Sequence, residues 1–291
     1  MIDLTKPAPA PKPEWLKVRL ASGPSYEHLK AKVKTLALHT VCQEAMCPNI
    51  GECWDAGTAT IMILGDTCTR ACHFCNVKTG SPRGEVDWLE PRRVAEAVRD
   101  LGWKYLVLTA VDRDDLADGG AAIFAGTVRM IHKLVPDAKV ECLTGDFAGD
   151  LAALDIVLEA RPEVLAHNLE TVPRLQGSVR DKRANFEQSI SILRHAKRSG
   201  EVRYTKTSLM LGFGEGEDEV AETMDAARAA GVDIFTMGQY LRPTKRHLEV
   251  VEFVTPEKFA RLREIALGKG FRQVVSSPLS RSSYHAEQAF A

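Results

Sequence analysis

The segment DTCTRACHFCNV, residues 66–77, contains three of the seven cysteines of this 291-residue chain. Cys68, Cys72 and Cys75 are spaced CxxxCxxC, and the aromatic Phe74 precedes the third. The apolar run TIMIL just before them is typical of a strand, so we expect the cysteines on a loop. Three thiolates at this spacing can hold three irons of a four-iron, four-sulfur cube, which leaves the fourth iron open to a small molecule. A zinc knuckle fits less well, because zinc sites normally take four ligands in CxxC-type pairs.

A second group of cysteines lies upstream, in VCQEAMCPNIGECW at residues 41–54. Cys42, Cys47 and Cys53 are spaced CxxxxCxxxxxC. The proline, asparagine and glycine between them predict a loop, so we expect the chain to wrap around a bulky object. The thiols are too far apart for one tight zinc knuckle, yet close enough to bracket a cube. We therefore favour a second iron–sulfur cluster over a zinc ion or plain buried cysteines.

The second group supplies only three thiolates, whereas a four-iron cluster takes four ligands. The C-terminal stretch SSPLSRSSYHAEQ, residues 276–288, is one candidate source, because it contains the adjacent Ser282 and Ser283. A tail this polar normally frays at the surface. A serine oxygen would be a weak and replaceable ligand. The residues alone do not prefer it over His39 or Glu52.

The charges of the chain nearly cancel, with 38 basic and 39 acidic residues. This balance argues against a general nucleic-acid-binding protein, which carries a basic excess. No apolar run approaches the roughly 20 residues that span a bilayer, and residues 1–20 lack the apolar core of a signal peptide. We therefore expect a cytoplasmic protein without membrane association, in which the cysteines bind metal and do not form disulfides. The stretch PAPAPKP, residues 7–13, predicts a polyproline-like or disordered arm.

From residue 58 onward, apolar strand-like runs alternate with amphipathic helical patterns. Repeated βα units imply parallel strands, and six of them predict an α/β fold, a partial, open (β/α)6 barrel. Such barrels carry their chemistry on loops at the carboxyl ends of the strands. We expect strands at 58–64, 104–111, 139–144, 163–168, 203–211 and 233–239, and helices at 26–38, 90–101, 119–134, 150–160, 184–199, 217–230 and 255–268.

Polar residues follow several of these strands, at the rim where we expect the site. The acidic loop that begins at Thr109 and includes Asp112 could bind an amino group or a ribose, although charged loops are usually solvated or cap helices. Asn168 and Glu170 follow the fourth strand and are predicted ligand contacts. His167 beside them is a ligand contact, a proton carrier or a satisfied structural residue.

The later strands add further candidates. Met210 offers an apolar wall, and Gly212 allows a backbone to approach a flat ring. Lys206 is either an edge residue that snorkels or a carboxylate clamp. Cys142 is predicted to be a small buried hydrophobe. A basic loop, either solvated or a docking patch for an acidic partner, contains Arg242, Lys245, Arg246 and His247.

The CxxxCxxC loop with its aromatic residue resembles that of the radical S-adenosylmethionine enzymes, in which the amino and carboxylate groups of S-adenosylmethionine occupy the open iron. Both cysteine groups in this order, with the blocks DRDDLADGG, HNLETV, GQYL and RSSYHA, make the chain similar to the lipoyl synthase family over nearly its whole length. The pair of cysteine groups is specific to that family in a way that neither group alone is. The departures from the family pattern touch no cluster ligand; they are Ala117, Thr207, Ser208 and Arg242.

The resemblance implies a sulfurtransferase that inserts two sulfur atoms, at C6 and C8, into an octanoyl group on a lysine of a lipoyl carrier protein. The carrier would be a dehydrogenase E2 subunit or the glycine cleavage H protein. The implied cofactors are S-adenosylmethionine and two [4Fe–4S] clusters, one that generates a radical and one that is consumed as the sulfur donor. The other implied partners are an electron donor such as ferredoxin or flavodoxin and an iron–sulfur carrier that rebuilds the donor cluster.

The resemblance also assigns residues. The radical-generating cluster would be held by Cys68, Cys72 and Cys75, and the donor cluster by Cys42, Cys47, Cys53 and Ser283, with Ser282 as the alternative serine. Contacts to S-adenosylmethionine would come from Phe74, Thr109, Asp112, Asn168, Glu170, Met210 and Gly212. The chain would comprise an N-terminal extension with the donor-cluster motif (1–57), the barrel (58–275) and a C-terminal tail that supplies the serine (276–291).

Two kinds of alternative remain open. A biotin synthase or a methylthiotransferase would share the radical chemistry, although a methylthiotransferase should carry a basic RNA-binding appendage that this near-neutral chain lacks. A zinc-stabilised scaffold would bind a partner and catalyse nothing. Two four-iron cubes require about eight irons per chain, so metal analysis separates the scaffold from the enzymes.

Overall fold

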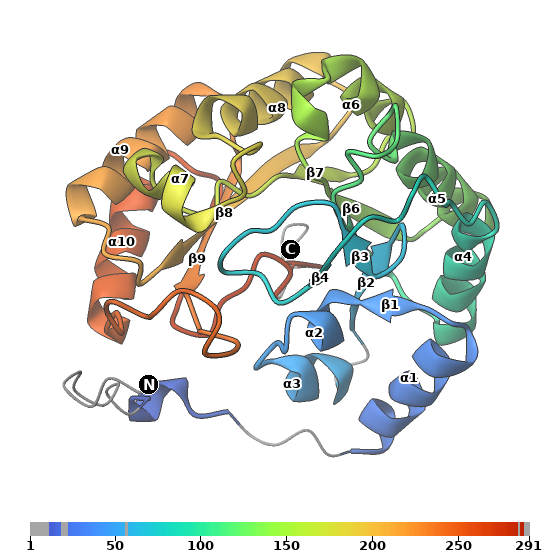
Figure 1. Ribbon diagram of the computed structural model, residues 1–291, viewed down its shortest axis with the longest axis horizontal. Coiled ribbons are helices and arrows are strands. Elements are labelled where there is room, and N and C mark those ends of the chain that lie inside the picture. Colours follow the sequence, from blue (N-terminus) through green and yellow to red (C-terminus); the bar gives the residue numbers. More distant parts are fainter. Residues whose placement is uncertain (1–11, 19–22, 56–57, 285, 288–291) are drawn as a thin grey trace.

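The structure, a computed structural model, describes residues 12–18, 23–55, 58–284 and 286–287; most of the predicted proline-rich arm lies outside these ranges. Its centre is an eight-stranded sheet with the order β1-β2-β5-β6-β7-β8-β9-β10. Because β1 and β10 are the two ends of this order, the sheet stays open. The helices form an arc around the outside of the strands (Figure 1). The predicted partial (β/α)6 barrel is therefore confirmed.

The six predicted strands and the helices after them are all present. The strands are β2 (Thr60–Ile63), β5 (Tyr105–Ala110), β6 (Lys139–Leu143), β7 (Val164–Ala166), β8 (Tyr204–Leu211) and β9 (Ile234–Gln239). The helices that follow them are α4 (Glu90–Leu101), α5 (Ala121–Leu134), α6 (Leu151–Leu158), α8 (Phe186–Ser199), α9 (Glu217–Ala229) and α10 (Pro256–Gly268). Each strand runs parallel to the next.

The strands read as continuous apolar runs because both of their faces are covered, as is usual for parallel sheets. Every residue of β2 and of β9 is buried. On the outside, α4 begins with a proline in its first turn and ends at Gly102, whose φ of 66° suits a helix C-terminus. Its inward stripe includes Val94 and Val98, which are fully buried. This packing fixes the strand ends on which the site is built.

Several short elements were not expected from the sequence, among them one strand and two helices. A seventh parallel strand, β10 (Gln273–Ser276), extends the sheet beyond β9. The second cysteine group is not simply a loop, because it forms the short helices α2 (Val41–Glu44) and α3 (Ile50–Asp55). Thr40 caps α2 by accepting a hydrogen bond from the Gln43 N–H at 3.4 Å. Of the predicted turn residues, Pro48 and Asn49 lie between the two helices, whereas Gly51 lies inside α3.

The N-terminal segment packs directly onto the barrel. β1 (His39–Thr40) pairs antiparallel with β2, and α1 (Pro24–Thr35) lies against α3. The Tyr26 ring lies 5.2 Å from the Trp54 ring, and Trp54 belongs to the same buried cluster as the inner face of α4. The helices that carry the second cysteine group are therefore anchored in the barrel core.

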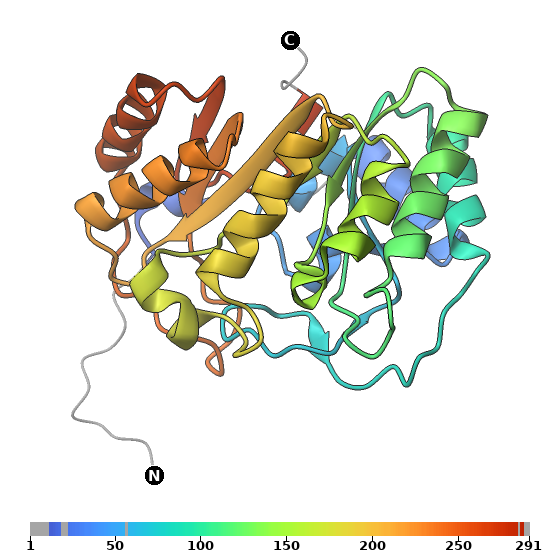
Figure 2. The ribbon, with the colours of Figure 1, turned by 90° about the horizontal axis from the view of Figure 1, so that it is seen from above.

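The loops after the parallel strands gather along one edge of the sheet (Figure 2). The CxxxCxxC loop lies there between β3 (Thr67–Cys68) and β4 (Lys78–Thr79), which form a small parallel sheet of their own. None of the helices in the described ranges is long and apolar enough to cross a bilayer.

Candidate functional site

A cavity of about 620 Å³ lies within the partial barrel and is lined by both cysteine groups. The wall includes Cys42, Cys47, Cys53, Cys68, Cys72, Cys75, Ser282 and Ser283. All six cysteines are free thiols. Across the described ranges, no three or more Cys, His, Asp or Glu side chains are arranged to hold a single metal ion. The structure brings both groups of three cysteines and the two serines to the lining of one cavity.

The CxxxCxxC loop is held from several sides. Cys68 lies in β3 and is paired with β4. The His73 N–H donates a hydrogen bond of 3.0 Å to the last carbonyl of α7 (Gln176–Val179). Nε2 of His247 lies 3.0 Å from the Cys75 carbonyl oxygen. These contacts orient the loop before any cofactor binds.

The C-terminal tail is tied to the second cysteine group across the cavity. The Asn49 side-chain amide donates to the Leu279 carbonyl at 2.7 Å, and the Tyr284 hydroxyl donates to Glu52 at 2.8 Å. A Cβ on Gly238 of β9 would meet a carbonyl oxygen of the tail at 2.0 Å, so only glycine allows the tail to lie on this strand. This close approach explains how the two serines reach the cavity wall. His39 and Glu52, the other candidate ligands, are not part of that wall.

Six of the seven predicted contacts to S-adenosylmethionine line the cavity; they are Phe74, Thr109, Asp112, Asn168, Glu170 and Met210. Gly212 does not. Its φ is 115°, its N–H donates to Glu215 at 2.5 Å, and a Cβ there would meet the Glu252 carbonyl at 2.7 Å. The glycine is needed for this turn, and the cavity lining does not support its predicted cofactor contact.

The wall after β7 has features of a ligand site. Glu170 adopts a left-handed φ of 65°, which is costly for this residue type and is often found at functional sites. Burial raises the pKa of its carboxyl, while the positive charge of Arg180 lowers it. Within the described ranges, Oδ1 of Asn168 and Oγ1 of Thr144 are buried without a hydrogen-bond partner. Since buried polar atoms are normally paired, these two acceptors suit a ligand that donates hydrogen bonds.

The cavity keeps the thiols protonated when no metal is bound. Burial raises the pKa of Cys72 to about 11 and the pKa values of Cys53 and Cys75 to about 12. The pKa values of the other three lining cysteines are also raised by burial. Metal binding must therefore displace protons, as it does at thiolate sites in general. Soft sulfur donors around a cavity of this size fit iron–sulfur clusters.

His167 has a structural role. Its side chain is buried, with Nδ1 2.9 Å from the Thr144 carbonyl oxygen and Nε2 2.9 Å from the Ser189 hydroxyl. Burial, with the nearby charge of Arg180, lowers the pKa of His167 to about 4. The ring is therefore neutral and already satisfied, which leaves it poorly suited to carry a proton.

Lys206 is not an edge residue. Its ammonium group lies 2.9 and 3.0 Å from the two oxygens of Glu141, and both side chains are buried. The Tyr105 hydroxyl donates to the same carboxylate at 2.6 Å. The predicted carboxylate clamp therefore holds a carboxylate of the protein itself. Cys142, which follows Glu141 in β6, is fully buried, and its interpretation as a small hydrophobe is confirmed.

The basic loop after β9 has an ordered base and an exposed tip. Nε of Arg242 donates to the His247 carbonyl at 2.9 Å, and Nη2 donates to the Lys245 carbonyl at 2.6 Å. Arg242 thus shapes the loop. Lys245 and Arg246 are exposed and available to a partner.

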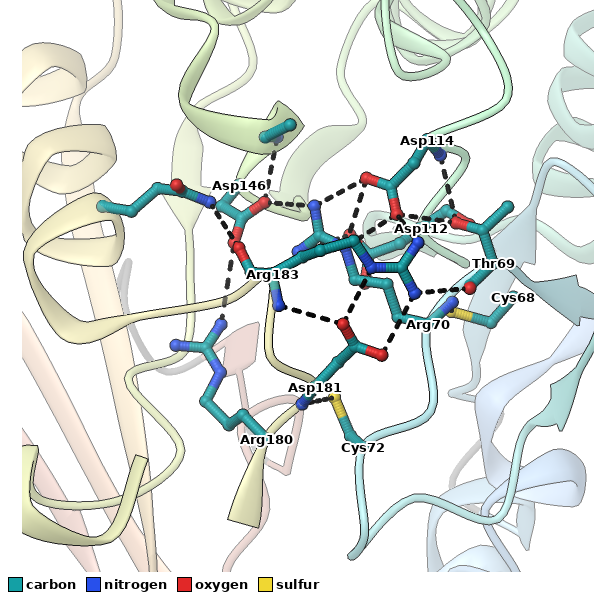
Figure 3. A network of polar contacts seen from close by, with 12 residues as sticks. Cys68, Thr69, Arg70, Cys72, Asp112, Asp114, Asp146, Arg180, Asp181 and Arg183 are labelled. Atoms are coloured by element: carbon teal, nitrogen blue, oxygen red, sulfur yellow. Dashed lines mark hydrogen bonds and ion pairs between the residues drawn. The ribbon is translucent and has the colours of Figure 1, made fainter. Parts of the chain in front are cut away.

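Sequence reasoning missed a network of charges behind the CxxxCxxC loop (Figure 3). The Arg70 side chain, only 2% exposed, lies 2.7 Å from both Asp114 and Asp146. The run VRDKR contributes Asp181 and Arg183 to the same network. The available signal was an arginine placed between two predicted cluster ligands, because a buried guanidinium requires carboxylates.

Comparisons with known proteins agree with this geometry. Residues 62–227 match the model of the radical S-adenosylmethionine superfamily, and residues 3–47 match that of the N-terminal domain of lipoyl synthase. Lipoyl synthase of Thermus thermophilus is 58% identical over 285 residues, which covers 98% of this chain and 88% of that protein. The chain belongs to the lipoyl synthase family. Lipoyl synthase 1 of Populus trichocarpa, a chloroplastic protein, is 55% identical over 96% of this chain and 76% of its own.

Lipoyl synthases are radical S-adenosylmethionine enzymes that use two [4Fe–4S] clusters for sulfur insertion. Membership therefore decides against the zinc scaffold, biotin synthase and methylthiotransferase alternatives. Solved structures support the fold alone. Methylornithine synthase superposes with a TM-score of 0.56 at 14% identity, over 88% of this chain and 79% of that one. Streptococcus suis SuiB bound to S-adenosylmethionine gives 0.58 at 12% identity, over 89% of this chain and 57% of that one.

Proposed function

We propose that this lipoyl synthase family member carries out its reaction in the cavity between the two cysteine groups. The reaction inserts two sulfur atoms, at C6 and C8, into an octanoyl group on a lysine of a lipoyl carrier protein. One observation carries the proposal: six cysteines from two separate parts of the chain line the same cavity of about 620 Å³. When bound, the cofactors supply a radical that breaks C–H bonds and the sulfur atoms that replace the hydrogens.

The role of the chain itself is to hold the clusters, orient the reacting groups and shield them from water. We assign Cys68, Cys72 and Cys75 to the cluster that binds S-adenosylmethionine, and the three cysteines of α2, α3 and their connecting turn to the donor cluster. Placing both in the lining of one cavity keeps the reacting groups close together and away from water. This assignment divides the chain into the donor-cluster extension (1–57), the barrel (58–275) and the serine-bearing tail.

The six cavity-lining candidates are assigned to S-adenosylmethionine by their chemistry. Asn168 offers a free acceptor to an ammonium or hydroxyl donor, and Glu170 can accept hydrogen bonds from ribose hydroxyls. Asp112 adds a second carboxylate to the lining, and Thr109 adds a hydroxyl that can donate or accept a hydrogen bond. Phe74 and Met210 supply apolar surface for a flat ring.

The fourth ligand of the donor cluster is assigned to Ser283, with Ser282 as the alternative. Both serines line the cavity, which supports either one. An alkoxide has a high intrinsic pKa. Protonation therefore releases iron from a serine ligand more readily than from a cysteine thiolate. A replaceable ligand of this kind suits a cluster that is dismantled in the reaction.

The substrate is an octanoylated carrier domain, either a dehydrogenase E2 subunit or the glycine cleavage H protein. We place its docking at the exposed tip of the basic loop, Lys245 and Arg246, because opposite charge on the carrier would steer the encounter. Ferredoxin or flavodoxin would supply electrons, and an iron–sulfur carrier would rebuild the donor cluster. A cytoplasmic location fits a set of free thiols that must stay reduced.

The direct test is incubation of anaerobic enzyme with an octanoylated carrier peptide, S-adenosylmethionine and a reductant, followed by mass spectrometry. We expect a product with two added sulfur atoms. Cys142→Ser, altered at a cysteine that does not line the cavity, is the matched control and should retain activity, whereas Cys53→Ser should form no dithiolated product. A chain that cleaves S-adenosylmethionine but never transfers sulfur to the peptide would contradict the proposal.

A further inference from the structure

Arg183 does not line the cavity, yet it contacts the CxxxCxxC loop at Thr69 and two further residues beside that loop, Asp114 and Asp181 (Figure 3). Its side chain is 41% exposed, so simple surface solvation would be the ordinary expectation. Instead, Nη2 donates to the Thr69 carbonyl, inside the loop, at 2.7 Å. Nη1 lies 3.1 Å from Asp114, which comes from the loop after β5. One exposed guanidinium therefore links the cysteine loop to a neighbouring strand end.

The third partner of Arg183 is Asp181. Nε donates to Oδ1 at 2.8 Å and Nη2 donates to Oδ2 at 3.1 Å, which is the fork geometry of a bidentate pair. The Arg183 N–H also donates to Oδ1 at 3.0 Å. These bonds hold the pKa of the Asp181 carboxyl well below its usual range. The carboxylate is thus fixed in one orientation.

Asp181 in turn contacts the cysteine loop at two points. Its carboxylate accepts a hydrogen bond from the Ala71 N–H at 2.9 Å. Its own main-chain N–H lies 3.3 Å from Sγ of Cys72 and points a donor at that sulfur. Hydrogen bonds to cluster sulfurs are among the factors that set the reduction potential of an iron–sulfur cluster.

We propose that Arg183 is a positioning residue for the radical-generating cluster: its guanidinium fork fixes Asp181, and Asp181 then aligns the Ala71 and Cys72 part of the loop. The inference rests on the proposed function, because Cys72 must be a cluster ligand. Arg183 does not line the cavity in which substrate and cofactors would bind. Its effect passes through the main-chain N–H of Asp181, which donates to Sγ of Cys72 and so favours the reduced, more negative state of the cluster. Loss of the fork should therefore make the cluster harder to reduce.

An isolated surface ion pair contributes little to stability. The neighbouring residues allow an effect of positive charge alone to be separated from an effect of the bidentate fork. Lys182 is adjacent, exposed and equally charged, and it makes none of the contacts described for Arg183. Lys182→Gln therefore removes one positive charge near the same loop without touching the network. Arg183→Gln removes the charge and the fork, whereas Arg183→Lys keeps the charge and removes only the fork.

The experiment measures two quantities on the reconstituted, full-length enzyme under anaerobic conditions. The first is hydrogen exchange of the peptide that contains Ala71 and Cys72. The second is the reduction midpoint of the cluster whose EPR signal changes when S-adenosylmethionine is added. In both Arg183 variants we expect hydrogen exchange of this peptide to be about tenfold faster, as for the loss of a charge-assisted hydrogen bond. We also expect a more negative reduction midpoint of the cluster in both. Lys182→Gln should stay close to the wild type in both measurements.

Two results would overturn the proposal. If Arg183→Lys matched the wild type in both readouts, the fork would be irrelevant. If Lys182→Gln shifted both readouts as far as Arg183→Gln did, the net charge near the loop and not the fork would account for the effect. Failure of the proposed function is separate, because it would appear in the wild type as a cluster signal that does not respond to S-adenosylmethionine.

Discussion

Mild acid should destabilise this protein through His167. The pKa of its buried ring is lowered to about 4, from an ordinary value of 6.5. The unfolded chain therefore binds a proton as the pH falls through 6.5, while the folded chain stays neutral until about pH 4. The stabilising contribution of the neutral ring is fully present above pH 6.5 and is lost as the pH falls from 6.5 towards about 4. Between pH 7.5 and pH 5.5 the loss is about 1.3 kcal/mol.

Urea unfolding of the reduced, metal-free chain at both pH values provides the assay. The control is His167→Asn, whose amide can still donate to the Thr144 carbonyl but does not titrate. Other histidines and carboxyls titrate in both proteins, so the difference between the two pH dependences isolates this ring. We expect the wild type to lose about 1.3 kcal/mol more than the variant. Equal losses would refute the conclusion that the fold holds His167 neutral.

Three other changes test separate parts of the structure. Lys206→Met should lower the free energy of unfolding by about 3–5 kcal/mol, because it leaves the buried Glu141 carboxylate without a positive partner. A loss of less than about 1 kcal/mol in urea unfolding would contradict the buried ion pair. Ser283→Cys should keep its iron but give less dithiolated product in a single turnover than Ser282→Cys, and full yield from it would reject the assignment. Lys245→Glu with Arg246→Glu should slow reaction with the carrier but not with a short octanoyl-lysine peptide; equal slowing argues against docking there.

The barrel could be predicted from sequence because each unit carries its own signals. The run at 203–211 was expected as a strand and forms β8 (Tyr204–Leu211), since apolar runs between amphipathic helices suit a doubly covered parallel sheet. The cysteine spacings likewise identified both triads. The second cysteine group was wrongly expected to be a loop, because short helices capped by one threonine leave little periodicity to detect.

Contacts between distant residues could not be predicted in this way. Tyr284 bonds to Glu52 across 232 positions, and Arg183 reaches Thr69 across 114. Local pattern gives no partner for such side chains, because only the curved arrangement of the whole open sheet brings them together. Gly212 shows a second limit: its positive φ and the nearby Glu252 carbonyl already require a glycine, so the glycine by itself does not indicate a ligand contact.

The central claim is that one cavity holds two cluster sites built from separate cysteine triads. The most direct measurement is iron and sulfide analysis of anaerobically purified protein, made on the wild type and on two triple alanine variants. One variant lacks Cys42, Cys47 and Cys53, and the other lacks the three cysteines of the CxxxCxxC loop. We expect about eight irons and eight sulfides in the wild type and about four of each in either variant. A wild type with only four irons, or a triple variant that keeps all eight, would contradict the account.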